Sequence, residues 1–181
     1  MPHVTLTTKR LLLRPWTEAD APRLFELCSD PKVGPACGFP PHTSVGQSLS
    51  AIRDELSNDE AYAVALAGTG EVIGCASLRF GDDACSLRDD EPELGFWIGS
   101  AYWGRGFATE AARRLVGHAF LDLSCSAVWC CHYEGNEASR RVQQKLGFSY
   151  VRTNPRGDTR LGYTLPEVES VLTRAAFDAT R

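Results

Sequence analysis

The stretch 102–110, Tyr-Trp-Gly-Arg-Gly-Phe-Ala-Thr-Glu, carries the residues best suited to bind an anion. The short apolar segment 94–99 before it favours a strand, and apolar residues recur at helical spacing after it. The stretch therefore joins a strand to the first turn of a helix, where backbone N–H groups lack intrahelical partners and the helix dipole is positive. Gly104 and Gly106 let an anion approach those amides closely. The expected guest is a phosphate or pyrophosphate.

Two familiar phosphate-binding motifs do not fit this turn. A Rossmann fingerprint needs a third glycine at position 109, where this chain has Thr109, and no suitable ribose-binding acid follows a second strand. A P-loop needs Gly-Lys-Ser or Gly-Lys-Thr, and the sequence contains neither. The spacing therefore excludes the usual nicotinamide and nucleoside-triphosphate sites.

Cysteine and histidine are the other candidates for chemistry. The seven cysteines are scattered and include no Cys-x-x-Cys pair, so a zinc framework is not expected. The run Cys130-Cys131-His132 suggests a metal or a thiol nucleophile, but adjacent strand residues point to opposite faces of a sheet. We therefore expect small buried cysteines in a reduced protein, and no metal.

The composition is that of a soluble globular protein. With 181 residues, 43% hydrophobic and 23% charged, the chain is expected to form one domain over 1–181. A net charge of −4 and a pI near 5.6 do not indicate a nucleic-acid partner. No apolar run reaches the ~20 residues that a membrane span needs, and no signal peptide is recognisable at the amino terminus. The expected location is the cytoplasm.

Helical and strand patterns alternate along the first half of the chain. Residues 6–14 predict a first strand, and Thr17 predicts the cap of a helix that ends before Pro31. Residues 31–43, rich in glycine and proline, predict an irregular loop. A capping box of Ser44 and Gln47 then predicts a helix to about residue 58.

The second half predicts a hairpin followed by a strand–helix–strand unit. The hairpin strands are 61–67 and 72–80, and a polar loop over 81–90 follows. Strand 91–99, a helix to about residue 123 and strand 127–132 then predict two parallel strands in one sheet. The remaining expected elements are a helix over 136–147, strands 148–152 and 159–165, and a short closing helix capped at 164–167.

The sequence resembles the GNAT superfamily of acetyl-CoA-dependent N-acetyltransferases. It resembles most the branch of ribosomal-protein alanine N-acetyltransferases, the RimJ/RimL type. The likeness covers nearly the whole chain and rests on Thr8-x-Arg10-Leu11-x-Leu13-Arg14, Glu93-Leu94-Gly95-Phe96-Trp97-Ile98, Tyr102-Trp103-Gly104-Arg105-Gly106-Phe107-Ala108-Thr109-Glu110-Ala111 and Asn136-x-x-Ser139-x-x-Val142-x-x-Lys145-Leu146-Gly147-Phe148.

The resemblance implies a mixed α/β (α+β) fold with a mostly antiparallel sheet. It would have about six or seven strands, a parallel pair at the cofactor site and about four or five helices, by analogy with the fold family. The cofactor expected from the resemblance is acetyl-CoA, as a co-substrate. Its pyrophosphate would be held by the turn Trp103, Gly104, Arg105, Gly106, Phe107, Ala108 and Thr109.

The remaining cofactor contacts are also implied by the resemblance. The edge of Phe96, Trp97 and Ile98 would pair with the pantetheine amides, and an N–H near Ile98 would polarise the thioester carbonyl. Asn136 and Ser139 would meet the pantetheine arm and the sulfur. The broader superfamily opens its turn with Arg or Gln where this chain has Trp103, so Arg105 is the candidate for the positive charge. Candidates for the 3′-phosphate, or merely for a solvated helix face, are Arg140, Arg141 and Lys145.

Amine acetylation also needs a base and a group that stabilises the departing thiolate. Glu93 is the candidate base, acting through a water, and the alternative is an ordinary strand-end carboxylate. Many superfamily members have a Tyr seven residues after the Asn, where this chain has Gln143, which cannot act as an acid. The branch resemblance places Ser139 at the sulfur instead, although a serine there could simply cap the helix. His132 is a weaker candidate.

The sequence therefore predicts an acyltransferase that acetylates a primary amine by direct attack on the thioester. The acceptor is a protein N-terminal amine or, alternatively, a small-molecule amine such as a polyamine, an amino acid or an antibiotic. A third interpretation is a non-catalytic acyl-CoA-binding regulator. Acceptor choice is expected from residues 31–45 and the strands after Phe148. The protein is expected to act as a monomer or homodimer without nucleic acid or membrane.

Overall fold

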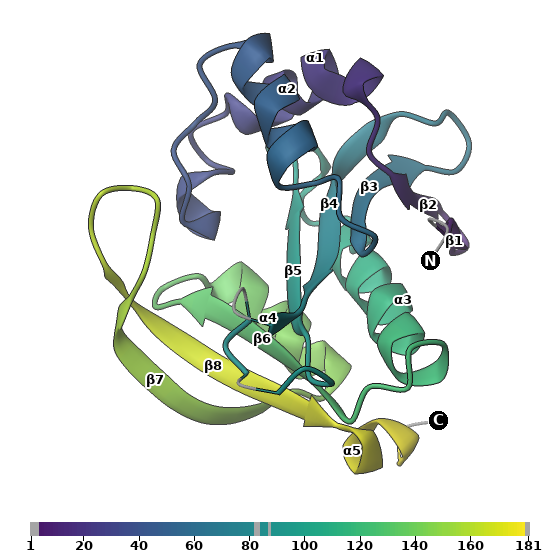
Figure 1. Cartoon of the computed structure of the whole chain (residues 1–181), viewed down its shortest axis with the longest axis vertical. Helices are drawn as coiled ribbons and strands as arrows, with labels where there is room; N and C mark the ends of the chain where they lie inside the picture. Colours follow the sequence, from purple (N-terminus) through teal and green to yellow (C-terminus); the bar gives the residue numbers. More distant parts are fainter. Residues whose placement is uncertain (1–3, 82–83, 87, 180–181) are drawn as a thin grey trace.

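The computed structural model describes residues 4–81, 84–86 and 88–179, and their centre is an eight-stranded sheet (Figure 1). The strand order is β1-β2-β3-β4-β5-β6-β8-β7. The strands are β1 (Leu6–Thr7), β2 (Leu11–Pro15), β3 (Ala61–Leu66), β4 (Val72–Arg79), β5 (Glu93–Ile98), β6 (Ala127–Tyr133), β7 (Ser149–Gly157) and β8 (Leu165–Thr173). The helices are α1 (Ala21–Cys28), α2 (Val45–Asp54), α3 (Phe107–Leu121), α4 (Glu137–Leu146) and α5 (Arg174–Asp178).

The sheet is antiparallel except where β5 meets β6, so the predicted fold class is confirmed with one or two more strands than expected. The parallel pair is joined only at Glu93 and Trp129. Beyond that point β5 continues beside β4 while β6 continues beside β8, and the two halves of the sheet diverge (Figure 1). This divergence leaves one edge of β5 without a neighbouring strand.

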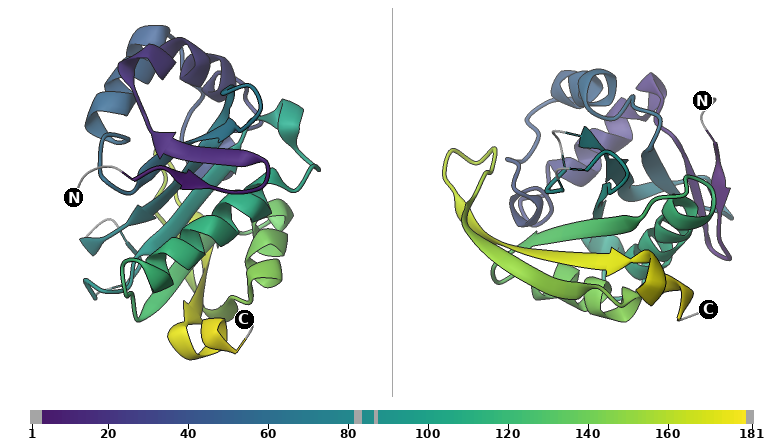
Figure 2. Two further views of the ribbon diagram at one scale, coloured as in Figure 1. Left: turned by 90° about the vertical axis from the view of Figure 1, so that its right-hand side faces the viewer. Right: turned by 60° about the horizontal axis from the view of Figure 1, so that its bottom comes forward.

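Helices cover both faces of the sheet. The predicted helix after the glycine turn is confirmed as α3, which buries Ala112, Leu115 and Ala119 completely. α4 packs beside α3 and under β6, while α1 and α2 cover the other face around Ala63 and Ala65 (Figure 2). The Ser44 cap of α2 is confirmed, because its hydroxyl accepts from the Gln47 N–H. No helix in the described residues is long and apolar enough to cross a membrane.

The prediction of one strand over 6–14 was wrong. The chain turns at 8–10, and β1 pairs antiparallel with β2, with Leu6 opposite Leu13. The Thr8 hydroxyl accepts from the Leu11 N–H at 2.9 Å, a local side-chain bond of the kind that favours a turn over a continuous strand. The resulting hairpin lies beside α3 (Figure 2).

The predictions of a strand over 159–165 and of a helix capped at 164–167 were also wrong. β7 and β8 form one long hairpin, and α5 begins after Thr173, whose hydroxyl accepts from the Ala176 N–H (Figure 2). Thr164-x-Pro-Glu matches a cap locally, but β8 finds partners on both sides, in β6 and β7. Tertiary pairing therefore overrides the local signal. The predicted polar loop over 81–90 includes residues 82–83 and 87, which lie outside the described residues.

Candidate active site

The glycine turn forms an open cradle of backbone amides. Gly104 and Gly106 have φ angles of 74° and 78°, a left-handed conformation that glycine adopts without strain. Gly106 is the N-cap of α3 and has no side chain to bond the amides of the first helical turn. No side chain at the N-cap therefore competes for those amides, which are the groups that a helix start can offer to an anion.

The free edge of β5 runs toward this cradle. The Gly99 N–H donates to the Ile73 carbonyl, so the backbone N–H and C=O groups of every second β5 residue point toward β4. Phe96 and Ile98 consequently direct their N–H groups to the opposite edge, past the single ladder contact with β6. The Ile98 carbonyl accepts from Trp103 Nε1 at 2.6 Å, which ties the turn to the end of the strand. The free edge of β5 can therefore form hydrogen bonds with an extended ligand in the way it would with a further strand.

A cavity of about 400 Å³ joins the glycine turn, the β5 edge and the start of α4. All the predicted cofactor residues except Arg105 line it: Phe96, Trp97, Ile98, Trp103, Gly104, Gly106, Phe107, Ala108, Thr109, Asn136 and Ser139. Arg105 lies instead with its guanidinium over the Phe107 ring, 5.0 Å from the ring centroid. Arg141 and Lys145 also line the cavity, whereas Arg140 pairs with Glu137.

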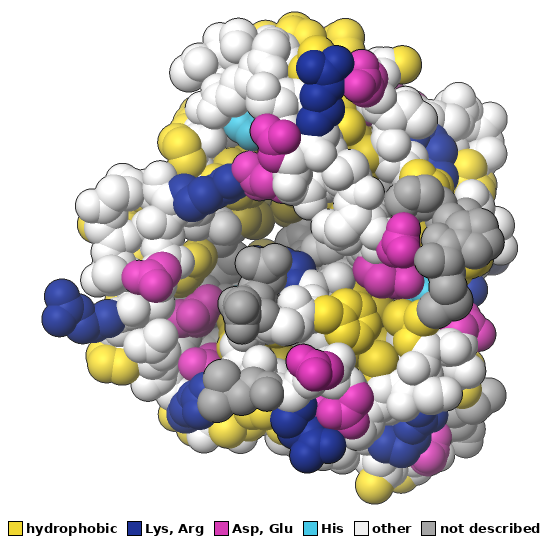
Figure 3. All heavy atoms as spheres, viewed as in Figure 1, with side chains coloured by type: hydrophobic (Ala, Val, Ile, Leu, Met, Phe, Trp, Pro, Cys, Tyr) yellow, Lys and Arg dark blue, Asp and Glu magenta, His cyan; other side chains and the backbone are white. Residues whose placement is uncertain are grey.

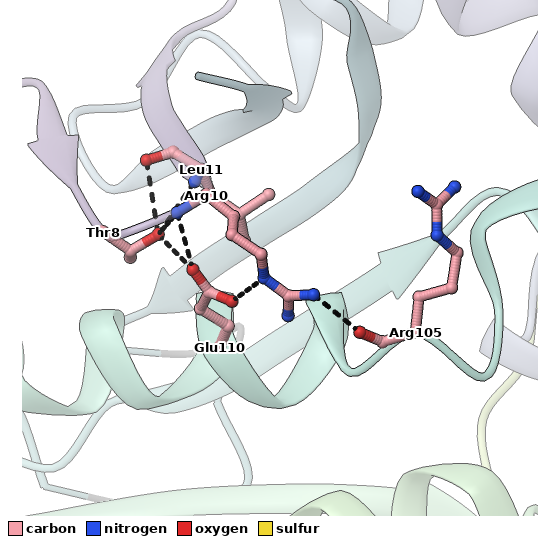
Figure 4. Close-up of polar contacts among 5 residues, drawn as sticks. All are labelled: Thr8, Arg10, Leu11, Arg105 and Glu110. Carbon is pink, nitrogen blue, oxygen red and sulfur yellow. Dashed lines mark hydrogen bonds and ion pairs between the residues drawn. The ribbon is translucent and has the colours of Figure 1, made fainter. Parts of the chain in front are cut away.

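A clamp from the amino-terminal hairpin holds the glycine turn (Figure 4). Glu110, in the first turn of α3, accepts from the Thr8 hydroxyl at 2.6 Å and from the Arg10 backbone N–H at 3.0 Å. The Arg10 side chain donates through Nε to Glu110 at 2.6 Å and through Nη1 to the Arg105 carbonyl at 3.0 Å. We call Thr8, Arg10 and Glu110 the hairpin clamp, and it ties the turn to the hairpin at Arg105 and at Glu110.

Asn136 joins α4 to the loop that was predicted to be irregular. Its Oδ1 accepts from the Ser139 N–H at 3.1 Å and caps the helix, while its Nδ2 donates to the Ala36 carbonyl at 3.0 Å. That loop, which holds only the short 3-10 helix Pro35–Cys37, therefore borders the same cavity. Ser139 is presented to the cavity from the first turn of α4.

Glu93, the first residue of β5, is not among the residues that line the cavity. Its side chain is buried, forms an ion pair with Arg79 and accepts from the Cys85 N–H at 3.0 Å. The ligand atoms of Cys85, Glu93 and Cys131 lie within 4.8 Å of one another, close enough to share a cation. The Arg79 guanidinium already bonds to this carboxylate and supplies the compensating positive charge.

The cysteines were only partly as expected. All seven are free, but Cys37 is exposed and Cys85 and Cys131 are half-buried. The sulfurs of Cys85 and Cys131 lie 3.2 Å apart, and this contact together with burial raises the pKa of the Cys131 thiol far above its usual range. Cys130 and Cys131 differ in burial, as expected for neighbours on a strand.

Sequence reasoning missed Glu167. It lies on β8 opposite Tyr133 of β6, on the sheet face that also carries Cys131 and Glu169. Burial, then the nearby charges of Glu93 and Glu169, raise the pKa of its carboxyl. On the face of the molecule seen in Figure 3, acidic side chains border a hollow near the middle. The alternation of Glu167, Val168 and Glu169 was the available signal, but it spans only three residues and the apparent helix cap obscured it.

The raised pKa of Glu167 predicts a pH-dependent stability change for Glu167→Gln. The folded protein binds this proton more tightly than the unfolded chain, so stability is lost as pH rises through the folded pKa. Removing the charge should therefore raise the melting temperature at about pH 8 and leave it unchanged below the unfolded value of 4.5. Thermal melts at both pH values test this, with the exposed Glu137→Gln as control. A lower melting temperature at about pH 8 would contradict it.

The two segments predicted to shape the acceptor side are joined. The Arg160 N–H, from the β7–β8 connection, donates to the Gly38 carbonyl at 2.7 Å. Gly38 has a φ angle of 81°, and a Cβ there would lie 2.6 Å from the Tyr133 hydroxyl. The loop therefore packs directly on the sheet face that carries Tyr133 and Glu167.

A free strand edge that ends at an amide cradle, within a divided sheet, is an arrangement suited to an extended, phosphate-bearing ligand. Residues 10–149 match the family model described as an acetyltransferase (GNAT) domain. The chain therefore belongs to the GNAT family of acetyltransferases, which are enzymes.

Relatives of known sequence or structure agree with this family. The uncharacterized N-acetyltransferase p20 of Bacillus licheniformis is 30% identical over 80% of this chain and 82% of its own. The putative ribosomal N-acetyltransferase YdaF of Bacillus subtilis is 35% identical over 44% of this chain and 41% of its own. An acetyltransferase structure from Agrobacterium tumefaciens superposes with a TM-score of 0.77 at 26% identity, covering 96% of both chains.

Proposed function

We propose that the protein transfers an acetyl group from acetyl-CoA to a primary amine by direct attack on the thioester. The observation that carries this proposal is the continuous cavity from the amide cradle along the free β5 edge to Ser139. Its lining suits a pyrophosphate at the amide cradle and a pantetheine arm along the strand. Residues 1–181 would act as one catalytic domain.

In this proposal the backbone does most of the cofactor binding. The amides of 104–109 hold the pyrophosphate, and the N–H groups of Phe96 and Ile98 face the pantetheine arm. The Ile98 N–H polarises the thioester carbonyl, a preorganised contribution that is often the largest in acyl transfer. Arg141 and Lys145, both on the cavity wall, supply positive charge for the 3′-phosphate.

Proton handling falls to side chains on either side of the cavity. Glu93 acts as the base through a water, since a carboxylate held by Arg79 and Cys85 still has lone pairs to accept a hydrogen bond. Ser139 stabilises the thiolate that leaves when the carbon–sulfur bond breaks. Glu167 adds negative charge beside Glu93. This charge favours binding of the acceptor amine in its protonated form, before the amine gives up its proton.

The acceptor we favour is the N-terminal amine of a protein, as in the RimJ/RimL branch. The branch motifs and the similarity to a relative named as a putative ribosomal N-acetyltransferase support this choice. A free α-amino group has a pKa of about 7.7–8.0, so it needs less help to lose its proton than a lysine at about 10.4. The second candidate, a small cationic amine, is favoured by the acidic residues around Glu167. Free cysteines throughout suit the reducing cytoplasm.

A thiol-release assay with acetyl-CoA tests the function. Peptides with free N-termini, the same peptides with blocked N-termini and a panel of polyamines, amino acids and aminoglycosides would be offered as acceptors. We expect free coenzyme A and an acetylated product with unblocked peptides. Release with small amines alone would select the second candidate. Acetyl-CoA binding without transfer to any acceptor would instead favour a binding protein and contradict the proposal.

A further inference from the structure

The buried side-chain amide of Gln143 donates a hydrogen bond to the Ser139 hydroxyl. Gln143 lies one helical turn after Ser139 on α4, is only 3% exposed and is not part of the cavity wall. Its Nε2 lies 3.3 Å from Ser139 Oγ and 3.3 Å from the Cys131 carbonyl oxygen. A backbone carbonyl can only accept, so Nε2 donates to Cys131 with one hydrogen and to Ser139 with the other.

This donation decides where the Ser139 hydrogen can go. A hydroxyl has one hydrogen and two acceptor lone pairs, and Gln143 occupies one of the lone pairs. Serine within a helix often donates back to a carbonyl four residues earlier, but among the described residues Ser139 Oγ makes no bond except the one it accepts. The hydrogen of Ser139 is therefore left for a partner in the cavity.

The Cys131 carbonyl keeps the Gln143 amide in this orientation. Gln143 Oε1 and His132 Nδ1 are both buried and have no hydrogen-bond partner within the described part of the chain. Burial is the largest effect on His132 and lowers its pKa, which favours a neutral imidazole. Rotating the amide would bring Oε1 against the Cys131 carbonyl, acceptor against acceptor.

We propose that Gln143 is a positioning residue that directs the Ser139 hydroxyl hydrogen to the sulfur of coenzyme A. This inference rests on the proposed function. When the carbon–sulfur bond breaks, its electron pair stays on sulfur, and the Ser139 O–H bonds to the resulting thiolate without giving up its proton. Gln143 cannot supply a proton at this position, but it turns the serine into an obligatory donor.

The pH dependence of coenzyme A binding tests this without knowledge of the acceptor. A free thiol titrates near pH 8.5, and a hydrogen bond that favours the thiolate lowers that pKa on the enzyme. We expect wild-type affinity for coenzyme A to rise roughly tenfold between about pH 7 and about pH 10, since one unit of pKa corresponds to tenfold. Acetyl-CoA has no ionisable thiol, so its affinity over the same pH range reports the pH effects that do not involve the sulfur.

Four variants separate positioning from structure. Gln143→Leu and Ser139→Ala should each abolish the rise with coenzyme A, and the double variant should behave like Ser139→Ala alone. The exposed neighbour Gln144→Leu is the control and should keep the rise. Affinity for acetyl-CoA should stay within about twofold of wild type in Gln143→Leu and Gln144→Leu, because neither of these side chains lines the cavity.

Two outcomes would overturn the inference while leaving the proposed function intact. The first is a full rise in Gln143→Leu when Ser139→Ala has lost it, which would mean that Ser139 needs no positioning by Gln143. The second is a full rise in Ser139→Ala, which would mean that another group faces the sulfur. Failure of wild type to bind acetyl-CoA would instead remove the proposed function and the inference together.

Discussion

Gly106→Trp is expected to weaken acetyl-CoA binding by about 100-fold or more. Hydrogen bonds to a charged group are worth roughly 1.5–3 kcal/mol each, so losing two amides from a phosphate suffices for this loss. The φ angle of 78° strains any L side chain, and a Cβ at this position, on the cavity wall, would lie 3.6 Å from the Arg10 guanidinium. Calorimetry with acetyl-CoA on both proteins gives the affinities directly.

Gly70→Trp is the matched control for backbone strain. Gly70 has a φ angle of 73° in the turn between β3 and β4, and a Cβ there meets nothing within 4 Å. The two substitutions therefore impose a similar left-handed strain, but only one lies at the cavity. We expect Gly70→Trp to keep wild-type affinity. Equal acetyl-CoA affinity in Gly106→Trp and wild type would remove the pyrophosphate from this turn.

Glu93→Gln is expected to lower the rate of acetyl transfer by about 10²-fold or more at unchanged affinity for acetyl-CoA. A positioned general base contributes about 10²–10⁴-fold, and glutamine keeps the shape of the side chain without its basicity. The substitution also removes the charge that Arg79 pairs with, so melting temperatures must accompany the rates. Turnover is measured with whichever acceptor the thiol-release assay selects.

Glu91→Gln is the control for the loss of a carboxylate in this segment. Glu91 accepts from Trp129 Nε1 at 2.8 Å and forms an ion pair with Arg88, so its bonds are made away from Arg79 and Cys85. We expect this variant to turn over at close to the wild-type rate. A Glu93→Gln enzyme as fast as Glu91→Gln would exclude Glu93 as the base and direct attention to Glu167.

Local signals predicted the glycine turn, because the spacing of its glycines and the start of the following helix can both be recognised within about ten consecutive residues. They also predicted that β5 and β6 are parallel. They could not predict that the two strands part after Glu93, since that depends on β6 taking β8 as its other neighbour. The free edge of β5, on which the proposed pantetheine site rests, is therefore a property of the assembled sheet.

Glu167 and Gln143 illustrate two different limits of sequence reasoning. Glu167 was hidden because a local helix-cap pattern competed with strand alternation, and only pairing across the sheet decides between them. Gln143 was identified and set aside because an amide cannot be an acid. Its contact with the Cys131 carbonyl on β6 gives it a different use, which is to fix the direction of a neighbouring hydroxyl.

The sequence separation of the hairpin clamp leads us to expect that the amide cradle is completed late in folding. Thr8 and Arg10 reach Glu110 across 102 and 100 positions of the chain, so these bonds close one of its longest loops. Contacts so distant in sequence form slowly, after local helices and hairpins. The ribosome must therefore have released residue 110 before the hairpin clamp can form. Until then, the first turn of α3 lacks its bonds to Thr8 and Arg10.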